Sequence, residues 1–139
     1  MIIFKKANKE EFKYCYDIRV KVFVDEQGWG IDEELDDLDS SCIHYLAKDD
    51  DKYIGTLRVY IKNGDGHVGR VCILKEYRGH YIGFNLMKYM EEDLKSEVKT
   101  LSLGAQSYAE DFYKKLGFES YGEHFTEGKI DHVNMIKKL

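Results

Sequence analysis

The chain has 139 residues, of which 43% are hydrophobic and 34% are charged, and its formal net charge at pH 7 is −5. This length is enough for one domain with a hydrophobic core and too short for two ordinary domains, so we expect residues 1–139 to form a single domain. The negative charge argues against nucleic acid or an anionic membrane surface as a partner, and no stretch of the sequence approaches a membrane span.

The cysteine content and the N-terminus indicate a reducing compartment. Cys15, Cys42 and Cys72 are an odd set without C-x-x-C spacing, which argues against a disulfide framework and against a zinc site. Each lies in a segment that we expect to face the core, so a buried free thiol is favoured over a catalytic one. Residues 1–6 lack the apolar run and cleavage site of a signal peptide. We therefore expect a cytoplasmic protein.

The chain begins with a predicted strand over residues 2–5, followed by a helix. Asn8 and Glu11 have the spacing of a capping box, in which each side chain binds the backbone N–H of the other residue. We expect one face of this helix to pack on a sheet, because six residues recur at helical spacing. They are Phe12, Cys15, Tyr16, Arg19, Val20 and Phe23.

An acidic segment follows at residues 25–39, where eight of fifteen residues are Asp or Glu and none is Lys or Arg. Gly28 and Gly30, on either side of Trp29, predict an irregular loop before a short helix over residues 31–38. Two interpretations of the charge remain open. The segment is either a solvated surface loop or a region that attracts a cationic substrate.

The middle of the chain predicts consecutive antiparallel strands. Residues 42–47 and 53–61 are strand-like and are separated by a short polar connection. The turn at residues 63–66 then leads into a third strand, so we expect a meander.

Residues 71–90 indicate an apolar strand, a turn with glycines and an arginine, and a helix expected over residues 83–97. Such a turn leaves several backbone N–H groups unpaired at the helix N-terminus, where the helix dipole adds partial positive charge. This arrangement predicts a phosphate-binding site.

The last third of the chain predicts a strand at residues 98–103 and a helix at residues 106–116, which Gly117 ends. Residues 118–125 and 129–136 then form a closing hairpin. The order of these elements is that of a mixed α/β protein with helices packed on a sheet.

Two spaced motifs resemble those of the GNAT superfamily of N-acetyltransferases. Residues 78–83, Arg-Gly-His-Tyr-Ile-Gly, resemble the acyl-CoA pyrophosphate loop of that family, in which Arg or Gln is followed by x-x-Gly-x-Gly/Ala. A second motif resembles Asn-x-x-Ala-x-x-x-Tyr-x-x-x-Gly-Phe, with Gln in place of Asn. It consists of Gln106, Ala109, Tyr113, Gly117 and Phe118. Two motifs in the right order are far more specific than either alone.

The two ends of the chain are similar to the small bacterial ElaA-like branch of this superfamily. The matching stretches are residues 19–27, residues 34–39, His44, residues 122–125 and residues 130–135. The resemblance implies an α/β (mixed, α+β-like) GNAT fold. Such a fold has a single central, mostly antiparallel twisted sheet of about seven strands flanked by about four helices.

Two residues depart from the family pattern. Tyr81 stands where the middle glycine of the loop usually lies, which puts the backbone conformation there in question. Gln106 is one methylene longer than the usual asparagine. Neither residue removes the cluster of backbone N–H groups, so we expect CoA binding to survive.

The resemblance implies acetyl-CoA as cosubstrate, bound by the two motifs and the strand before them. Backbone groups of Val71, Cys72 and Ile73 would pair with the pantetheine arm. Gln106 and Tyr113 would complete the site. The pyrophosphate would be held by Arg78, Gly79, His80, Tyr81, Ile82 and Gly83.

No metal is expected at this site. His124 and His132 lie eight residues apart on strands that we expect to pair, and they lack a third ligand.

The implied reaction is direct transfer of the acetyl group to a primary amine, which needs a base, a stabilised oxyanion and an acid for the departing thiolate. Tyr113 occupies the position that commonly serves as the acid. The candidates for the base are Glu26, Glu34, Asp36 and His44, and each has an ordinary alternative. Glu34 and Asp36 would also suit a loop brace, and His44 would also suit a hydrogen-bonded core residue.

We therefore predict an enzyme, an acetyl-CoA-dependent N-acetyltransferase acting on a small-molecule or peptidic amine. The alternative is a non-catalytic acyl-CoA-binding sensor or interaction module of the same fold. An exposed edge strand would allow a homodimer, as is common among GNAT proteins.

Overall fold

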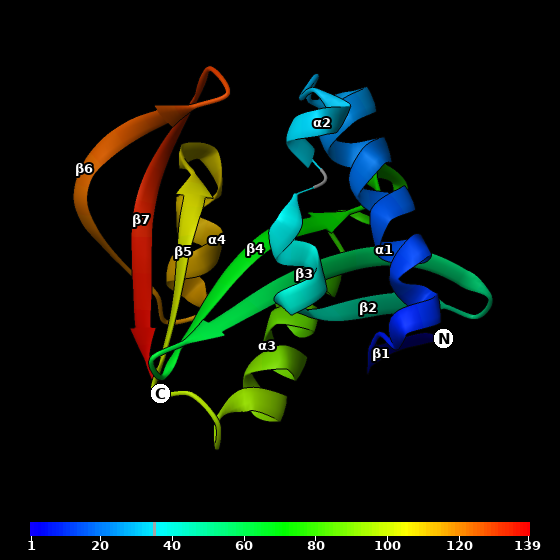
Figure 1. Ribbon diagram of the computed structural model, residues 1–139, viewed down its shortest axis with the longest axis horizontal. Helices are drawn as coiled ribbons and strands as arrows, with labels where there is room; N and C mark the ends of the chain where they lie inside the picture. Colours follow the sequence, from blue (N-terminus) through cyan, green and yellow to red (C-terminus); the bar gives the residue numbers. More distant parts are fainter. Residues whose placement is uncertain (35) are drawn as a thin grey trace.

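The computed structural model describes residues 1–34 and 36–139. Over these residues, seven strands form one sheet in the order β1-β2-β3-β4-β5-β7-β6 (Figure 1). The strands are β1 (Ile2–Lys6), β2 (Ile43–Asp49), β3 (Lys52–Lys62), β4 (Asp65–Ile73), β5 (Thr100–Gln106), β6 (Glu119–Glu127) and β7 (Ile130–Lys138). All strand pairs are antiparallel except β4 with β5, which run parallel. The predicted mixed α/β sheet of about seven strands is confirmed.

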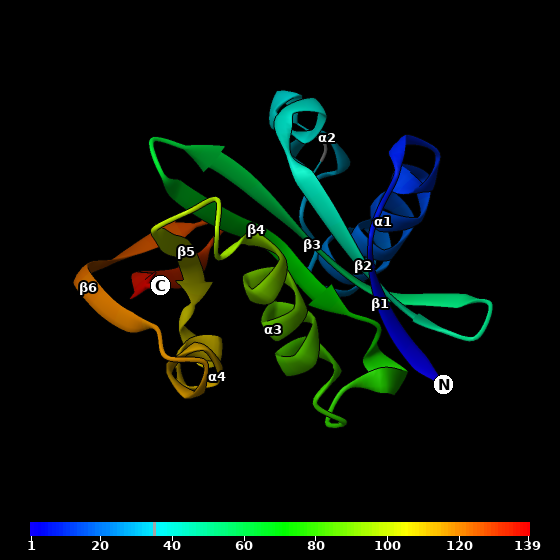
Figure 2. The same cartoon turned by 90° about the horizontal axis from the view of Figure 1, so that it is seen from below.

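Helices cover both faces of the sheet. Figure 2 shows α1 (Phe12–Arg19) and the single-turn α2 (Ile31–Glu34) on one face, with α3 (Ile82–Leu94) and α4 (Glu110–Lys115) on the other. The predicted capping box before α1 is confirmed. The Asn8 side chain accepts a hydrogen bond from the Glu11 N–H at 2.9 Å, and the Asn8 N–H donates to the Glu11 carboxylate at 3.0 Å.

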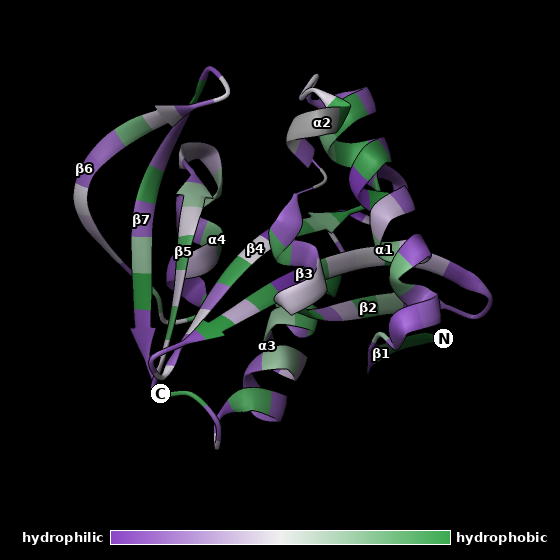
Figure 3. Ribbon diagram, viewed as in Figure 1, coloured by the Kyte–Doolittle hydropathy of each residue, from purple (hydrophilic) through white to green (hydrophobic). Residues whose placement is uncertain are grey.

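The core lies between the sheet and these helices. Leu86, Met90 and Leu94, at helical spacing on α3, are fully buried, and on the other face α1 buries Cys15 and Ile18. Figure 3 shows hydrophobic residues along β3 and β4, whereas the β2–β3 connection is hydrophilic. Each fully buried aliphatic side chain contributes about 1.5–3 kcal/mol, so these contacts dominate the stability of the fold.

Several element boundaries differ from the sequence-based expectations. α3 ends at Leu94, and β5 runs from Thr100 to Gln106 because its whole length pairs with β7. A short 3₁₀ turn therefore precedes α4, which starts only at Glu110.

Of the helix expected over residues 31–38, the structure shows α2 and a later 3₁₀ turn, Asp37–Ser41. Leu35 lies outside the described residues. No helix within residues 1–34 and 36–139 is long and apolar enough to cross a membrane.

Candidate active site

A cleft of about 1360 Å³ lies where β4 and β5 separate. The two strands pair only from Asp65 with Thr100 to Val68 with Leu103, and beyond this point they diverge (Figure 1). The divergence coincides with an irregular register between β3 and β4, and Arg70 on β4 has a left-handed backbone with φ 54°. Such a bulge increases local twist and turns the strand away from its neighbour.

One wall of the cleft is the turn at residues 78–83, which we call the glycine turn, together with the start of α3. In the described part of the chain, no backbone or side-chain group accepts a hydrogen bond from the backbone N–H of any residue from Gly79 to Gly83. The 13-residue α3 adds the partial positive charge of its N-terminus at the same place. Unpaired N–H groups and this dipole fit a phosphate.

Tyr81 is the N-cap of α3 and has φ 61° and ψ 15°, which is the left-handed region. This is the conformation that a glycine adopts without strain, so the tyrosine keeps the backbone course of the turn at a conformational cost. Its side chain is 77% exposed and lies at the rim of the cleft.

The free edge of β4 forms the floor beside the glycine turn. The Leu74 N–H donates to the Ile54 carbonyl of β3 at 2.8 Å. Since backbone groups alternate in direction along a strand, those of Cys72 face β3, and those of Val71 and Ile73 face the gap toward β5. Of the three residues expected to pair with the pantetheine arm, Val71 and Ile73 therefore have backbone groups that face the gap. The backbone groups of Cys72 face the neighbouring strand β3.

Arg78 connects the glycine turn to the opposite face of the cleft. Its guanidinium makes a bidentate ion pair with Glu26, at 2.5 and 2.7 Å, and its Nε donates to the Ile73 carbonyl at 3.0 Å. Glu26 ends a π-helical segment, Val20–Glu26, that continues from α1. Hydrogen bonds from Arg78 lower the pKa of Glu26, so this carboxylate holds a proton less readily than a free one.

Tyr113 enters the cleft from α4. Only 8% of the residue is exposed, and Phe112 and Phe118 contact its ring in edge-on geometry at 5.0 and 6.0 Å. Burial raises the pKa of the Tyr113 phenol. The hydroxyl therefore keeps its proton at neutral pH and is available as a donor to a group in the cleft.

A chain of side chains crosses the cleft near Gln106. The Gln106 amide donates to the Gln27 side-chain oxygen at 3.0 Å, and the Trp29 indole N–H donates to the same oxygen at 3.2 Å. The Trp29 ring packs directly against Gly128 in the β6–β7 turn, where an added Cβ would lie 2.2 Å from the ring. Gln106 thus joins the end of β5 to the segment that covers the cleft.

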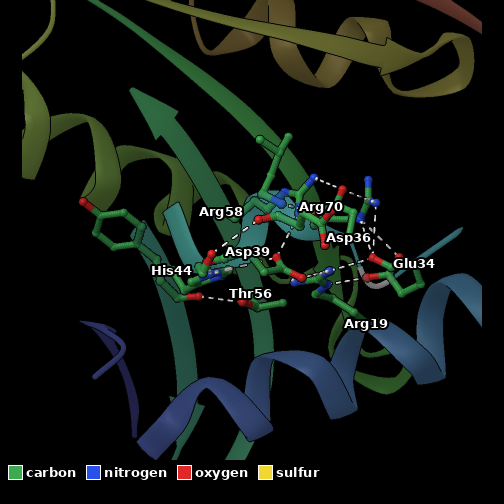
Figure 4. A network of polar contacts seen from close by, with 12 residues as sticks. Arg19, Glu34, Asp36, Asp39, His44, Thr56, Arg58 and Arg70 are labelled. Carbon is green, nitrogen blue, oxygen red and sulfur yellow. Dashed lines mark hydrogen bonds and ion pairs between the residues drawn. The ribbon is translucent and has the colours of Figure 1, made fainter. Parts of the chain in front are cut away.

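Buried ion pairs support the floor of the cleft from the α1 face (Figure 4). Arg19, only 1% exposed, binds Asp39 through two hydrogen bonds at 2.9 and 3.1 Å and also pairs with the Glu34 carboxylate. Arg19 thereby ties helix α1 to the last residue of α2 and to the 3₁₀ turn Asp37–Ser41.

Two further arginines from the sheet complete this network. Arg58 on β3 binds Asp36 through two hydrogen bonds at 2.7 and 2.8 Å and binds Asp39 at 2.8 Å. Arg70 pairs with Glu34 at 3.2 Å and with Asp36 at 3.3 Å. Hydrogen bonds from Arg58 lower the pKa of Asp36 to about 2. We call Arg19, Arg58, Arg70, Glu34, Asp36 and Asp39 the ion-pair network.

His44 lies beside the ion-pair network and outside the residues that line the cleft. Its Nε2 is 2.9 Å from the Asp39 carbonyl, and its ring packs on Phe12. Burial lowers the pKa of His44. This placement favours the core role that the sequence left open, because a base must reach the amine directly or through one water.

These contacts change the interpretation of the acidic segment. Among the described side chains of this segment, the carboxylates of Glu26, Glu34, Asp36 and Asp39 bind arginines. Much of the acidic charge is therefore balanced locally, and the loop brace predicted for Glu34 and Asp36 has direct partners. Glu34 still lines the cleft, with 3% of the residue exposed.

The cysteines do not supply a nucleophile to the cleft. Cys15 and Cys72 are buried and Cys42 is partly buried, without disulfide bonds. Burial raises the pKa of all three thiols, that of Cys15 to about 11. The thiolate is the reactive form, so these residues are inert at neutral pH.

The cleft therefore brings together most of the predicted site residues, including Glu26, Glu34, Arg78, Gln106 and Tyr113. His80 is exposed and does not line it. Sequence reasoning missed Gln27 and Trp29 because no spacing rule predicts their contact with β5 and the β6–β7 turn. It also missed His132 as a residue of the cleft, because the sequence analysis considered this histidine only as a metal ligand.

Comparison with known proteins defines the class. The family model described as "Acetyltransferase (GNAT) domain" matches residues 15–139. The chain is 34% identical to the uncharacterized N-acetyltransferase YjcF of Bacillus subtilis, with 94% of each protein covered. It is 30% identical to the protein ElaA of Escherichia coli, over 88% of this chain and 84% of ElaA.

A solved structure from Lactobacillus plantarum superposes with a TM-score of 0.90 at 30% identity, covering 100% of this chain and 97% of the other. The chain belongs to the GNAT acetyltransferase family. It is an acyltransferase, and the predicted resemblance to the ElaA-like branch is confirmed.

Proposed function

We propose that this protein is an acetyl-CoA-dependent N-acetyltransferase that transfers the acetyl group directly to a primary amine. The observation that carries the proposal is the continuity of the cleft. Unpaired N–H groups of the glycine turn lead along the free edge of β4 to the hydroxyl-bearing side chain of Tyr113.

The chain has groups suited to each part of acetyl-CoA. The N–H groups of residues 79–83 bind the pyrophosphate with the help of the α3 dipole. The backbone groups of Val71 and Ile73 bind the amides of the pantetheine arm as a neighbouring strand would. Bound in this way, acetyl-CoA supplies an activated acetyl group at the point where β4 and β5 diverge.

Tyr113 supplies the proton that the leaving thiolate requires. Its phenol is kept protonated by burial, and an ordinary thiol has a pKa of about 8.5, so the departing sulfur is basic enough to need a donor. Arg78 has a second role besides binding phosphate. Its ion pair with Glu26 holds the glycine turn against the acceptor side of the cleft.

The acceptor is a small-molecule or peptidic amine. Such an amine has a pKa of about 10.4 in water, so it arrives protonated and must lose a proton before it attacks. Because the carboxylates of Glu26, Glu34, Asp36 and Asp39 are paired with arginines, we expect the choice of acceptor to depend on the shape of the cleft as well as on charge.

The test measures free-thiol release from acetyl-CoA with a panel of polyamines, amino sugars, amino acids and lysine peptides. We expect amine-dependent release, with the acetylated amine identified by mass spectrometry. Calorimetric titration with CoA, with ATP and NAD as controls, measures binding separately. Tight CoA binding without thiol release for any amine would favour the acyl-CoA sensor over the enzyme.

A further inference from the structure

We infer that His132 is the general base of the proposed transfer and takes the proton from the acceptor amine at its Nε2 atom. This inference rests on the proposed function and names a residue that acts within the same cleft. His132 lies on β7, only 6% of it is exposed, and it lines the cleft.

The hydrogen bond of His132 fixes its tautomer. Nδ1 lies 2.8 Å from the Ile130 carbonyl oxygen, and a carbonyl only accepts. Nδ1 therefore carries the hydrogen, and in the neutral ring the lone pair belongs to Nε2. The Phe125 ring stacks on the imidazole, with 5.5 Å between the ring centroids and 22° between the ring planes, and this contact fixes the orientation of the imidazole. A base needs this combination of a held ring and a free lone pair.

Nε2 is open to the cleft. No group in the described part of the chain hydrogen-bonds this atom. If this atom were fully buried, it would be a buried polar atom without a hydrogen-bond partner. Among the described residues, the one such atom is Nδ1 of His44, so Nε2 of His132 is in contact with solvent. Because the ring lines the cleft, the cleft is where Nε2 is reached.

The position of His132 matches the acceptor side. His132 lies opposite Gln106 in the β5–β7 pair, and directly opposite residues project from the same face of a sheet. Gln106 reaches Gln27 on the face that carries α1 and α2, so His132 projects to that face as well. Gln106 is the last residue of β5, and His132 lies opposite it on β7, beyond the point where β5 diverges from β4. An amine entering between these elements passes His132 on the way to the thioester.

Several charged groups lie near His132 or line the same cleft. Asp131, its neighbour in sequence, is held by Ser107 and His124. Glu127 lies in the same hairpin, and the cleft walls carry Glu26, Glu34, Arg58 and Arg70. The carboxylates Glu26 and Glu34 are both bound by arginines, whereas the described residues offer no such partner to Glu127 or to Nε2 of His132. Glu127 is exposed at the end of the hairpin and His132 is buried, which favours His132.

His67 is the competing histidine, because it also lines the cleft. Its Nδ1 lies 2.9 Å from the Ser102 hydroxyl, which donates to Asp65 at 2.6 Å. However, His67 is exposed and sits below Val68, where β4 and β5 are still paired. His132 is buried and sits where the strands are apart, and this difference favours it.

The protons balance as follows. The ammonium substrate gives one proton to Nε2 of His132 and then forms the new N–C bond as the C–S bond breaks. The nitrogen loses a second proton, and the CoA sulfur receives one through Tyr113. One proton is released to solvent per turnover when His132 and Tyr113 return to their starting forms.

The first test observes the ring nitrogens of the protein without CoA by long-range ¹H–¹⁵N correlation. We expect neutral His132 to show a protonated Nδ1 and an unprotonated Nε2. A ring with the proton on Nε2 would overturn the proposal, since the lone pair would then face the Ile130 carbonyl.

The second test uses His132→Asn, whose amide can still donate to the Ile130 carbonyl but lacks any group at the Nε2 position. We expect CoA affinity and melting temperature close to wild type and kcat/KM for the amine lower by about 10²-fold or more. His124→Asn is the matched control, because His124 lies on the paired strand and is exposed.

The outcomes separate the two proposals. If the wild type releases no thiol with any amine, the proposed function fails. If the wild type is active and His132→Asn keeps its kcat/KM for the amine, only the base assignment fails. A loss confined to His67→Asn would transfer the role to His67 and equally overturn the inference.

Discussion

At the scale of single residues, the proposed CoA chemistry depends on Tyr81 and Tyr113. Tyr81 replaces the glycine of the family loop and still adopts the left-handed backbone, with φ 61°. A bulky residue in the left-handed region carries about 1–3 kcal/mol of strain. Because the Tyr81 side chain is 77% exposed, hydrophobic burial offsets little of this strain. The loop conformation thus survives the substitution at the expense of stability.

Replacing Tyr81 with glycine tests this interpretation. Glycine removes the strain but adds about 0.5–1 kcal/mol of chain entropy cost, so we expect the free energy of unfolding to stay level or to rise by up to about 2.5 kcal/mol. CoA affinity should be equal or higher in calorimetry. Tyr81→Ala is the control, because it removes the ring and keeps the strain. Tenfold weaker CoA binding in both variants would show instead that the ring itself contacts CoA.

The second residue-scale prediction concerns Tyr113→Phe. Removing the hydroxyl leaves the packing against Phe112 and Phe118 in place, so CoA binding and thermal stability should hold. We expect kcat to fall by about 10²-fold because the leaving thiolate loses its proton donor. Tyr121→Phe on the exposed surface of β6 is the control. Unchanged turnover in Tyr113→Phe would remove the acid role.

At the scale of elements, the ion-pair network decides where the α2 loop lies. Arg19 comes from α1, Arg58 from β3 and Arg70 from β4, and their carboxylate partners all come from residues 34–39. The network therefore fixes one wall of the cleft to three elements of the fold. Its energetic effect appears mainly when one partner is removed, because a buried charge is then left uncompensated.

Arg19→Met is the direct test of this support. The variant fills most of the same space but leaves Glu34 with Arg70 alone and Asp39 with Arg58 alone. We therefore expect a loss in the free energy of unfolding of up to about 3–5 kcal/mol, the range for a buried charge left without a partner. Urea denaturation measures it. Lys21→Met, at an exposed position on the next turn, is the control. A loss no larger than the control's would show that the network contributes little.

The same network predicts how stability depends on pH. Arg58 holds the pKa of Asp36 at about 2, below the ordinary value of 3.8. A carboxylate with a lowered pKa stabilises the fold fully above its unfolded-state value and loses this contribution as pH falls through the folded-state value. Stability should therefore decline from about pH 4 toward pH 2. In Asp36→Asn, denaturation curves should show a shallower decline over this window, and an identical slope would contradict the assignment.

At the scale of the whole molecule, the order of the elements along the chain and the glycine turn followed from local patterns in the sequence, and the role expected for Tyr113 followed from the resemblance to the GNAT motif. The pairing of Arg19 with Glu34 and Asp39 did not, because the partners are 15 and 20 residues apart and meet only after the sheet forms. The same holds for Gln27 and Gln106, which are 79 residues apart. Local periodicity predicts elements, whereas contacts across the cleft depend on how those elements are assembled.

The proposed function places acetyl-CoA and the amine in one cleft, and burial raises the pKa of the three cysteine thiols, which makes them poor nucleophiles at neutral pH. Direct transfer therefore requires acetyl-CoA and the amine to be bound together. Initial rates measured while both concentrations are varied test this requirement. We predict intersecting lines in double-reciprocal plots, as a ternary complex gives. Parallel lines, the signature of a covalent acetyl-enzyme, would contradict the account.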